Sequence, residues 1–419
     1  MEPAQKRPRP HYAWVILIAC CLIQGGTVGI VQNCRGIFYN FVCGDLGFEV
    51  SAFTLYSLFH GIGSFLFMPL STRLADRARP RLVLLACLLM FGGSTALFGS
   101  MRQLIGFYLL GFVQGMGASL FTFYICPLLI GNWFKKHYGL AMGIYGAFSG
   151  LTGILANPLL NRAIESFGWR NGYRIQGLAC LAFSVPAVLL IKAIRPADLG
   201  QTRLGETREE AAAAGAAALS AAPLAPATKR EKKILAISLV IAVLIATVNS
   251  YTQHFSKYAA TIGLSSEVGA LLVSCAMASN LVFKFLLGNL NDRIGTIRTL
   301  LAAEGLLILG FLGMLCRPLG ILYPSSFLAG LCLPLCATCV PMLMRHLFGQ
   351  ARFRKFYSTV TMVNALCSSF AIFSISLVYE IRYSYVPVFL LGAAMVLVSA
   401  ILMLLANRIA HPAREADAP

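Results

Sequence analysis

The sequence predicts an all-α membrane protein with twelve transmembrane helices arranged as two six-helix bundles. Three observations predict this class. Apolar residues make up 58% of the 419 residues and charged residues only 12%, with a mean hydropathy of +0.74, whereas a soluble domain carries about 25% charge. Twelve segments reach the ~20 apolar residues that a spanning helix needs. A charged motif also recurs half a chain apart.

The twelve predicted spans follow one another along the whole chain. They cover roughly residues 13–38, 51–71, 82–100, 104–130, 139–161, 173–193, 234–260, 267–289, 299–316, 319–346, 356–379 and 384–407. Spans of ~20 residues each leave only tails, loops and one linker outside the membrane. We therefore expect no soluble catalytic domain.

The recurring motif closes the second span of each half. Residues 72–81 read TRLADRARPR and residues 288–298 read GNLNDRIGTIR. Their aspartates, Asp76 and Asp292, lie 216 residues apart. A repeat of this length among apolar segments indicates two homologous membrane bundles joined in one unit.

A low-complexity segment separates the two bundles. Residues 195–233 contain an alanine-rich run that is too weakly apolar to span a membrane. We interpret this segment as a flexible or partly helical cytoplasmic linker. The N-terminal bundle then covers residues 1–194 and the C-terminal bundle residues 234–419.

The basic residues predict the orientation. The net charge is +18, but 25 of the 34 Lys and Arg residues lie in the tails and every second loop, and seven lie in the alternate loops. Short loops rich in Lys and Arg stay in the cytoplasm, so we expect both termini and the linker there. This distribution argues against nucleic-acid binding. No cleavable signal peptide is expected, because the first apolar stretch is too long.

The repeated motif resembles the loop 2–3 signature of the major facilitator superfamily. The second copy keeps its aspartate, arginine and both glycines, while the first copy has Thr72 and Arg79 at the glycine positions. Residues 132–143, NWFKKHYGLAMG, and 167–173, FGWRNGY, are similar to stretches of monocarboxylate porters. Residues 196–200, PADLG, resemble bacterial relatives that include the oxalate:formate antiporter group. The resemblance implies a plasma-membrane protein, in bacteria one of the inner membrane.

Two of the basic residues, Arg35 and Lys284, fall inside spans 1 and 8. An ionised side chain in a bilayer costs ~2.5 kcal/mol or more and usually faces a cavity or the bundle interior, although either residue could instead snorkel to the membrane surface. In monocarboxylate porters a lysine of span 1 and an arginine of span 8 contact the substrate carboxylate. The resemblance implies that Arg35 and Lys284 take these roles and hold one anion from both sides.

Further polar residues are candidates for binding and proton coupling. Asn280 lies one turn before Lys284 on the same face, where the animal porters have an aspartate used in proton coupling; it cannot ionise but can donate a hydrogen bond. His254 titrates near neutral pH and, with Lys284, is a candidate proton carrier, although it could equally be a structural polar residue. Tyr124 is a further candidate for substrate binding in the cavity, although it could equally form a hydrogen bond with a neighbouring helix. Glu304, early in span 9, is the other candidate proton carrier, although its expected place near the cytoplasmic surface favours pairing with a basic loop residue.

Glycines in spans 4 and 5 recur mostly every three or four residues, which permits close helix packing. Many proton-coupled members of the superfamily have an arginine in span 4, four residues before a Gly-x-Gly. Here Gly111 takes that place before Gly115 and Gly117, so coupling through a span-4 arginine is not expected. The charged pairs Asp76–Arg77 and Asp292–Arg293 are interpreted as gating latches, which form at helix ends in one conformation and break in another.

Neither a cofactor nor a metal is expected, and the chain is not predicted to be an enzyme. No nucleotide-binding loop, paired carboxylates or nucleophile–base pair is present in the spans. Three cysteines of span 10 share one helical face, but no nearby histidine completes a metal site, so they are assigned to packing. They are Cys332, Cys336 and Cys339.

The sequence thus predicts a secondary carrier of a small organic anion. The expected substrate is a monocarboxylate such as lactate or pyruvate, moved together with protons across the bilayer by rocking-bundle alternating access. An oxalate:formate type of exchange is the alternative mechanism. Two alternative functions are a non-transporting membrane sensor on the same fold and efflux of hydrophobic cations. Whether an accessory subunit is needed does not follow from the sequence.

Overall fold

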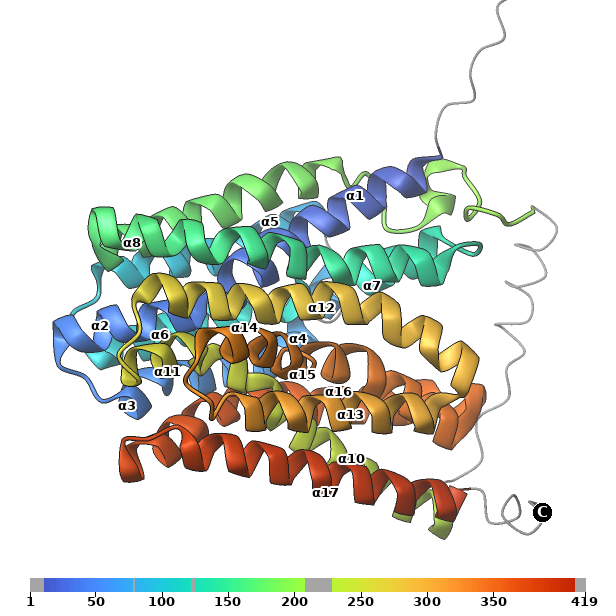
Figure 1. The fold of residues 1–419 in the computed structure, drawn as a ribbon. Coiled ribbons are helices and arrows are strands. Elements are labelled where there is room, and N and C mark those ends of the chain that lie inside the picture. Colours follow the sequence, from blue (N-terminus) through green and yellow to red (C-terminus); the bar gives the residue numbers. More distant parts are fainter. Residues whose placement is uncertain (1–10, 78–79, 122–124, 208–227, 411–419) are drawn as a thin grey trace, which may run out of the picture.

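The computed structural model describes residues 11–77, 80–121, 125–207 and 228–410, and these residues are almost entirely helical (Figure 1). We call residues 11–207 the N-terminal half and residues 228–410 the C-terminal half. The helices of the N-terminal half are α1 (Tyr12–Gln24), η1 (Gly25–Gln32), η2 (Arg35–Ile37), α2 (Phe38–Leu46), α3 (Val50–Thr54), α4 (Tyr56–Arg77), α5 (Pro80–Leu97), η3 (Phe98–Ser100), α6 (Leu104–Leu120), α7 (Cys126–Trp133), α8 (Tyr138–Leu190) and η5 (Pro196–Leu199).

The C-terminal half has a similar series of long helices and short irregular turns. Its helices are α10 (Lys229–Asn249), η6 (Ser250–His254), α11 (Phe255–Thr261), α12 (Ser266–Ile294), α13 (Thr296–Gly313), α14 (Leu319–Ala329), α15 (Cys332–Pro334), η7 (Leu335–Cys339), α16 (Val340–Arg382) and α17 (Val386–Ala410). Of the described residues, none forms a named β-strand; a single isolated bridge joins Phe134 and Leu204.

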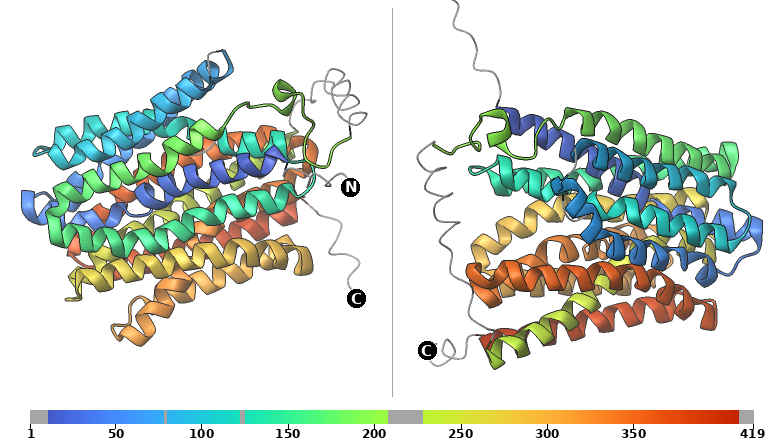
Figure 2. Two further views of the ribbon diagram at one scale, coloured as in Figure 1. Left: turned by 90° about the horizontal axis from the view of Figure 1, so that it is seen from above. Right: turned by 180° about the vertical axis from the view of Figure 1, so that it is seen from behind.

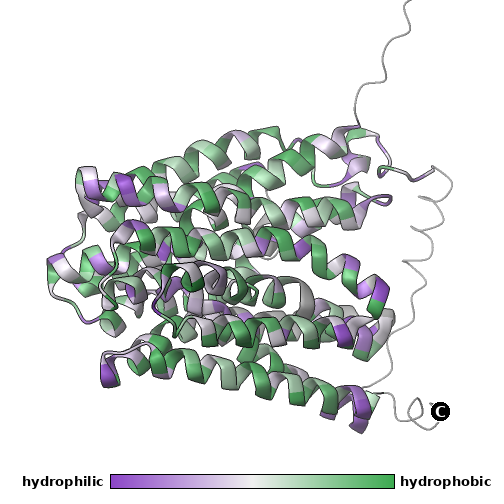
Figure 3. Ribbon diagram, viewed as in Figure 1, coloured by the Kyte–Doolittle hydropathy of each residue, from purple (hydrophilic) through white to green (hydrophobic). Residues whose placement is uncertain are grey.

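The helices have the length and composition of membrane spans. Within the described residues, nine helical segments are long and apolar enough to cross a bilayer, and the apolar helix α6 is slightly shorter. Hydrophobic residues occupy the central parts of the helices, and hydrophilic residues are concentrated at both ends of the molecule (Figure 3). Many large apolar side chains are exposed, among them Ile381 with 76% of its surface. A lipid environment accounts for this exposure, since soluble monomers rarely expose large apolar patches.

Two long helices each contain a backbone break at a glycine. Gly168 in α8 has φ 78° and ψ 157°, and Gly349 in α16 has φ 66° and ψ 173°. Glycine adopts positive φ without the steric cost that other residues meet. The break in α8 falls between the predicted spans 139–161 and 173–193, which agrees with two spans there.

The predicted first span, 13–38, is not one continuous α-helix. After α1 it continues as the π-helix η1, then as the short 3₁₀-helix η2, and extends to Leu46 in α2. The expected span 234–260 is likewise interrupted, by the 3₁₀-helix η6. Glycines allow the first irregular turn to pack closely, because a Cβ at Gly29 would lie 1.8 Å from Thr152 Oγ1. Such turns are frequent at functional sites.

The two halves are joined by hydrogen bonds that gather at the end of the molecule opposite to the first and last described residues (Figures 1 and 2). Gln253 of η6 accepts from the backbone N–H of Gly36 over 3.2 Å and donates to the carbonyl of Gln32 over 3.1 Å. Thr54 and Ser376 share a hydrogen bond of 2.8 Å. This end of the molecule is therefore held closed.

Two of the sequence motifs have structural roles at the helix ends. Near the break at Gly168, the indole of Trp169 donates to Asp45 over 3.0 Å, and Arg170 forms an ion pair with the same carboxylate at 3.4 Å. At the opposite end, the segment after η5 folds back, so that the Leu204 carbonyl accepts from Lys135 N–H over 3.2 Å. The first residues of the predicted linker thus pack against the N-terminal half.

Close packing of α4 on α6 predicts a strong effect of one added methyl group. A Cβ at Gly115 would lie 1.9 Å from the backbone oxygen of His60, so Gly115→Ala forces the two helices apart at a cost of about 1–3 kcal/mol. We expect a lower thermal unfolding temperature in detergent. Gly93→Ala is the matched control, because its Cβ would meet nothing within 4 Å. Equal unfolding temperatures of the two variants would contradict the packing.

Candidate functional site

Arg35 is buried inside the N-terminal half, with 9% of its surface exposed. It begins η2, and its Nη2 donates to Gln114 Oε1 over 3.0 Å and to the imidazole of His60 over 3.3 Å. Its guanidinium carbon lies 6.0 Å from the ring centroid of Tyr56. Gln114 is held in turn, because its Nε2 donates to Thr95 Oγ1 over 2.7 Å. Arg35 is therefore fixed by its own half and does not snorkel.

One nitrogen of the same guanidinium lacks an acceptor within the described residues. Arg35 Nε is buried and has no hydrogen-bond partner in the described part of the chain. A buried unsatisfied donor on a charged group is costly, and a carboxylate is the acceptor that guanidinium binds best. An acceptor bound at Nε would therefore not replace the contacts to Gln114 and His60.

Lys284 is part-buried in α12 and reaches across to the other half of the molecule. Its Nζ donates to the carbonyl of Gly146 in α8 over 2.6 Å. Gly146 lies among the glycines of α8, where Gly150 and Gly153 bring α8 close to Met277 of α12. Lys284 therefore lies at the contact between the halves and, like Arg35, forms no ion pair within the described residues.

Arg35 and Lys284 have separate hydrogen-bond partners, but Lys284 and a sequence neighbour of Arg35 contact the same stretch of α8. Asn33, two residues before Arg35, donates to the carbonyl of Ser149 over 3.2 Å, one turn from the glycine that Lys284 contacts. Asn280, one turn before Lys284, is 4% exposed, and its buried Oδ1 has no hydrogen-bond partner among the described residues. Asn33 of the N-terminal half and Lys284 of the C-terminal half thus both contact residues 146–149.

His254 is buried within the C-terminal half. Its Nε2 lies 3.2 Å from the carbonyl of Ile372, and its Nδ1 lies 3.3 Å from the hydroxyl of Tyr385. The carbonyl can only accept, so the proton is assigned to Nε2, and Nδ1 accepts from the tyrosine. The ring also packs edge-on against Tyr39 of the other half. His254 therefore lies at the contact between the two halves. Its hydrogen-bond partners differ from the Gly146 carbonyl that Lys284 contacts.

The remaining predicted residues are placed at helix ends or lie outside the description. Asp76 and Arg77 end α4, while Asp292 and Arg293 lie in the last turns of α12. Arg293 is exposed; the side chains of the other three lie outside the described part. Tyr124 also lies outside the described residues, so its role stays a prediction.

Glu304 differs from its expectation. It forms no ion pair with a described basic residue; it is 3% exposed in α13, where its Oε1 accepts from the hydroxyl of Ser399 over 2.8 Å. The prediction of a surface ion pair was wrong because α13 already begins at Thr296, which places Glu304 about two turns inside the helix.

Sequence reasoning missed His60 and Gln114, the two side chains that hold Arg35. A signal was available for both, since a histidine and an amide in apolar spans need a polar partner. His60 lies in span 2 and Gln114 directly before the Gly115–Gly117 pair. Which polar groups meet depends on how each helix is rotated, and the sequence does not fix that rotation.

Comparison with known proteins identifies the family. The profile of the Major Facilitator Superfamily matches residues 21–371 and 235–419. The chain therefore belongs to the major facilitator superfamily, whose members are membrane transporters of small molecules and not enzymes. The resemblance and the transporter class predicted from the sequence are confirmed.

Individual relatives are distant. The riboflavin transporter RibJ of Trypanosoma brucei brucei is 26% identical over 214 residues, which are 49% of this chain and 38% of that protein. Monocarboxylate transporter 3 of Mus musculus is 28% identical over 176 residues, 41% of this chain and 34% of that protein. Monocarboxylate transporter 6 of Homo sapiens is 28% identical, over 42% of this chain and 35% of that protein. The chain thus matches little more than a third of the length of these relatives.

Solved structures share the fold at low identity. The nucleoside transporter NupG superposes with a TM-score of 0.71 at 12% identity, covering 93% of this chain and 99% of that one. A D-xylose–proton symporter gives a TM-score of 0.67 at 15% identity, covering 93% of this chain and 96% of that one. The likeness shows the fold of this chain and no more.

Proposed function

We propose that this chain is a secondary transporter of small organic anions, and that it carries monocarboxylates together with protons. The observation that carries the proposal is the pair of cations described above. Arg35 belongs to the N-terminal half and Lys284 to the C-terminal half; both lie inside apolar helices, and neither has an acidic partner in the described residues. A carboxylate between the halves would supply the missing negative charge. The names of the distant monocarboxylate transporters support the same substrate class.

The proposed architecture consists of twelve spans in two six-helix bundles, residues 1–194 and 234–419, joined by the cytoplasmic linker 195–233. Two observations support it. The first and last described residues lie at the same end of the molecule (Figure 2). Basic residues lie beside them, since Lys192 contacts Tyr12 and Arg230 contacts Ile409, which supports the cytoplasmic side of a plasma membrane.

Transport would proceed by alternating access of one central site. In the described conformation, the contacts of Gln253 with Gly36 and Gln32 close the end opposite to the termini. We propose that this is the outer side, and that the motif pairs Asp76–Arg77 and Asp292–Arg293 close the inner side in the other conformation. In this scheme His254 and Lys284 are the candidate proton carriers at the site.

A pH gradient tests the proton coupling. In proteoliposomes that contain the purified protein, acid outside and neutral inside should drive labelled lactate above its equilibrium level, because symported protons move down their gradient. His254→Gln should weaken this accumulation while facilitated exchange of labelled for unlabelled lactate persists. Collapse of the gradient with a protonophore is the control.

Exchange is the second candidate function, because Asn280 cannot ionise and two cations without an acidic partner suit a dianion. If the uptake of labelled lactate does not depend on the pH gradient and is accelerated by oxalate inside the vesicles, this would contradict symport and support exchange. Liposomes without protein provide the background for both measurements.

A further inference from the structure

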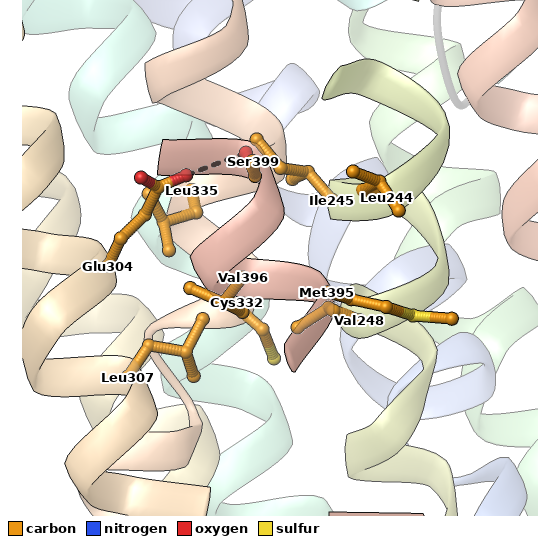
Figure 4. A pocket seen from close by; sticks show the side chains of 10 residues that line it. All are labelled: Leu244, Ile245, Val248, Glu304, Leu307, Cys332, Leu335, Met395, Val396 and Ser399. Atoms are coloured by element: carbon orange, nitrogen blue, oxygen red, sulfur yellow. Dashed lines mark hydrogen bonds between the residues drawn. The ribbon is translucent and has the colours of Figure 1, made fainter. Parts of the chain in front are cut away.

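A buried carboxyl group lies in the C-terminal half, away from the contact between the halves. Glu304 of α13 faces α17, where the hydroxyl of Ser399 donates to its Oε1 over 2.8 Å (Figure 4). Its Oε2 is buried and has no hydrogen-bond partner in the described residues. The transport site proposed above uses neither Glu304 nor Ser399.

Two small pockets meet at this carboxyl. The first lies between α10, α13, α15 and α17 and extends past Leu307 and Val248 toward the closed end of the molecule. The second extends past Leu300, Ile241 and Met403 toward the end that carries the termini. Glu304 lines both pockets. Each is too small for an organic ligand and has room for about a single water molecule.

The surroundings favour the neutral acid in this conformation. All other described lining residues are apolar except Ser399 and the thiol of Cys332, which is the one further titratable group facing either pocket. Of the side chains that the structure describes in α10, α15, α16 and α17, no basic one lines them. If Glu304 were ionised, its buried charge would be stabilised by one neutral donor, Ser399, and its Oε2 would have no partner among the described residues. If it is protonated, the only group left without a partner among them is one neutral hydroxyl. The ionised form is by far the more costly of the two.

We infer that Glu304 is a proton-binding site within the C-terminal half, reached by single water molecules through the pocket on either side. Hydronium transfers a proton to the carboxylate, which leaves a neutral carboxylic acid and one water molecule; release is the reverse. Binding removes a buried charge from between α10, α13 and α17, so protonation stabilises the described packing of these helices. The inference deepens the proposed symport, in that Glu304 supplies an ionisable group that Asn280 does not.

Infrared difference spectroscopy of the purified protein in lipid nanodiscs tests the site without any substrate. A pH titration should show the carbonyl band of a buried protonated carboxylic acid, and Glu304→Gln should remove it. Glu267→Gln is the matched control, because Glu267 is exposed and pairs with Arg162 at 3.7 Å; it should leave the band in place. A band that persists in Glu304→Gln, or no band in the parent protein, would overturn the inference.

A second variant keeps the test decisive if Glu304→Gln does not fold. Ser399→Ala removes the hydroxyl that donates to Oε1, so the same band should remain and move to higher frequency, as a carbonyl does when it loses a hydrogen bond. An unmoved band would contradict the assignment. Because no anion is present in either measurement, an absence of lactate uptake would disprove the proposed function and leave this result standing. If both hold, Glu304→Gln should lose accumulation driven by a pH gradient and retain lactate exchange.

Discussion

Lys284→Ala is expected to reduce saturable uptake of labelled lactate into proteoliposomes about 30-fold or more. Removing one partner of a buried charged interaction costs about 2–5 kcal/mol, and every 1.4 kcal/mol is a factor of ten. The amine of Lys284 lies at the contact between the halves, so its loss removes half of the positive charge proposed to hold the anion. Uptake at several lactate concentrations would show the effect.

Two further variants make the result specific. Lys192→Ala removes an exposed lysine and should leave uptake unchanged. Lys284→Arg keeps the charge and should retain part of the activity, because guanidinium also binds carboxylates but is larger and planar. All variants must elute as folded protein on gel filtration. Unchanged uptake by Lys284→Ala would contradict a role in anion binding.

Gly36→Ala is expected to open the closed end of the molecule. A Cβ at residue 36 would lie 1.9 Å from the backbone oxygen of Gln253 and 2.7 Å from its carbonyl carbon. Because both sides are backbone, η2 and η6 must move apart, at a cost of about 1–3 kcal/mol to the described conformation. Hydrogen–deuterium exchange should become faster in α2 and α11, which adjoin the contact.

Gly44→Ala provides the matched control, because a Cβ at that exposed glycine would meet nothing within 4 Å. It lies in α2, so the same peptides report on both variants. Exchange rates that stay equal in Gly36→Ala and Gly44→Ala would show that the contact between η2 and η6 does not hold the two halves together.

The class of fold could be predicted from the sequence because the membrane imposes it. Backbone polar groups in lipid must be satisfied within the chain, so long apolar segments become helices. The glycine spacing also predicted a close approach correctly: Gly146, Gly150 and Gly153 do bring α8 against α12. The breaks inside the first span were not predicted, since hydropathy averages over π- and 3₁₀-turns.

The surroundings of the candidate site were harder to predict. In a helix that is apolar on all sides, the periodic pattern no longer marks one inner face, so the partners of Arg35 could not be read from spacing. His60 and Gln114 reach it from α4 and α6, two other helices of the same half. The burial of Glu304 likewise depended on where α13 begins and on Ser399, 95 residues further along the chain.

The two cations differ in how they are tethered. Arg35 forms hydrogen bonds with partners of its own half and would move together with them. Lys284 instead donates a hydrogen bond to a carbonyl of the opposite half, and this bond must break whenever the halves separate. An arriving carboxylate would offer the ammonium a replacement acceptor. The substrate carboxylate and the Gly146 carbonyl would then compete for the same ammonium group. Without substrate, the hydrogen bond to Gly146 would hold the two halves together. With substrate bound, the halves would be free to separate.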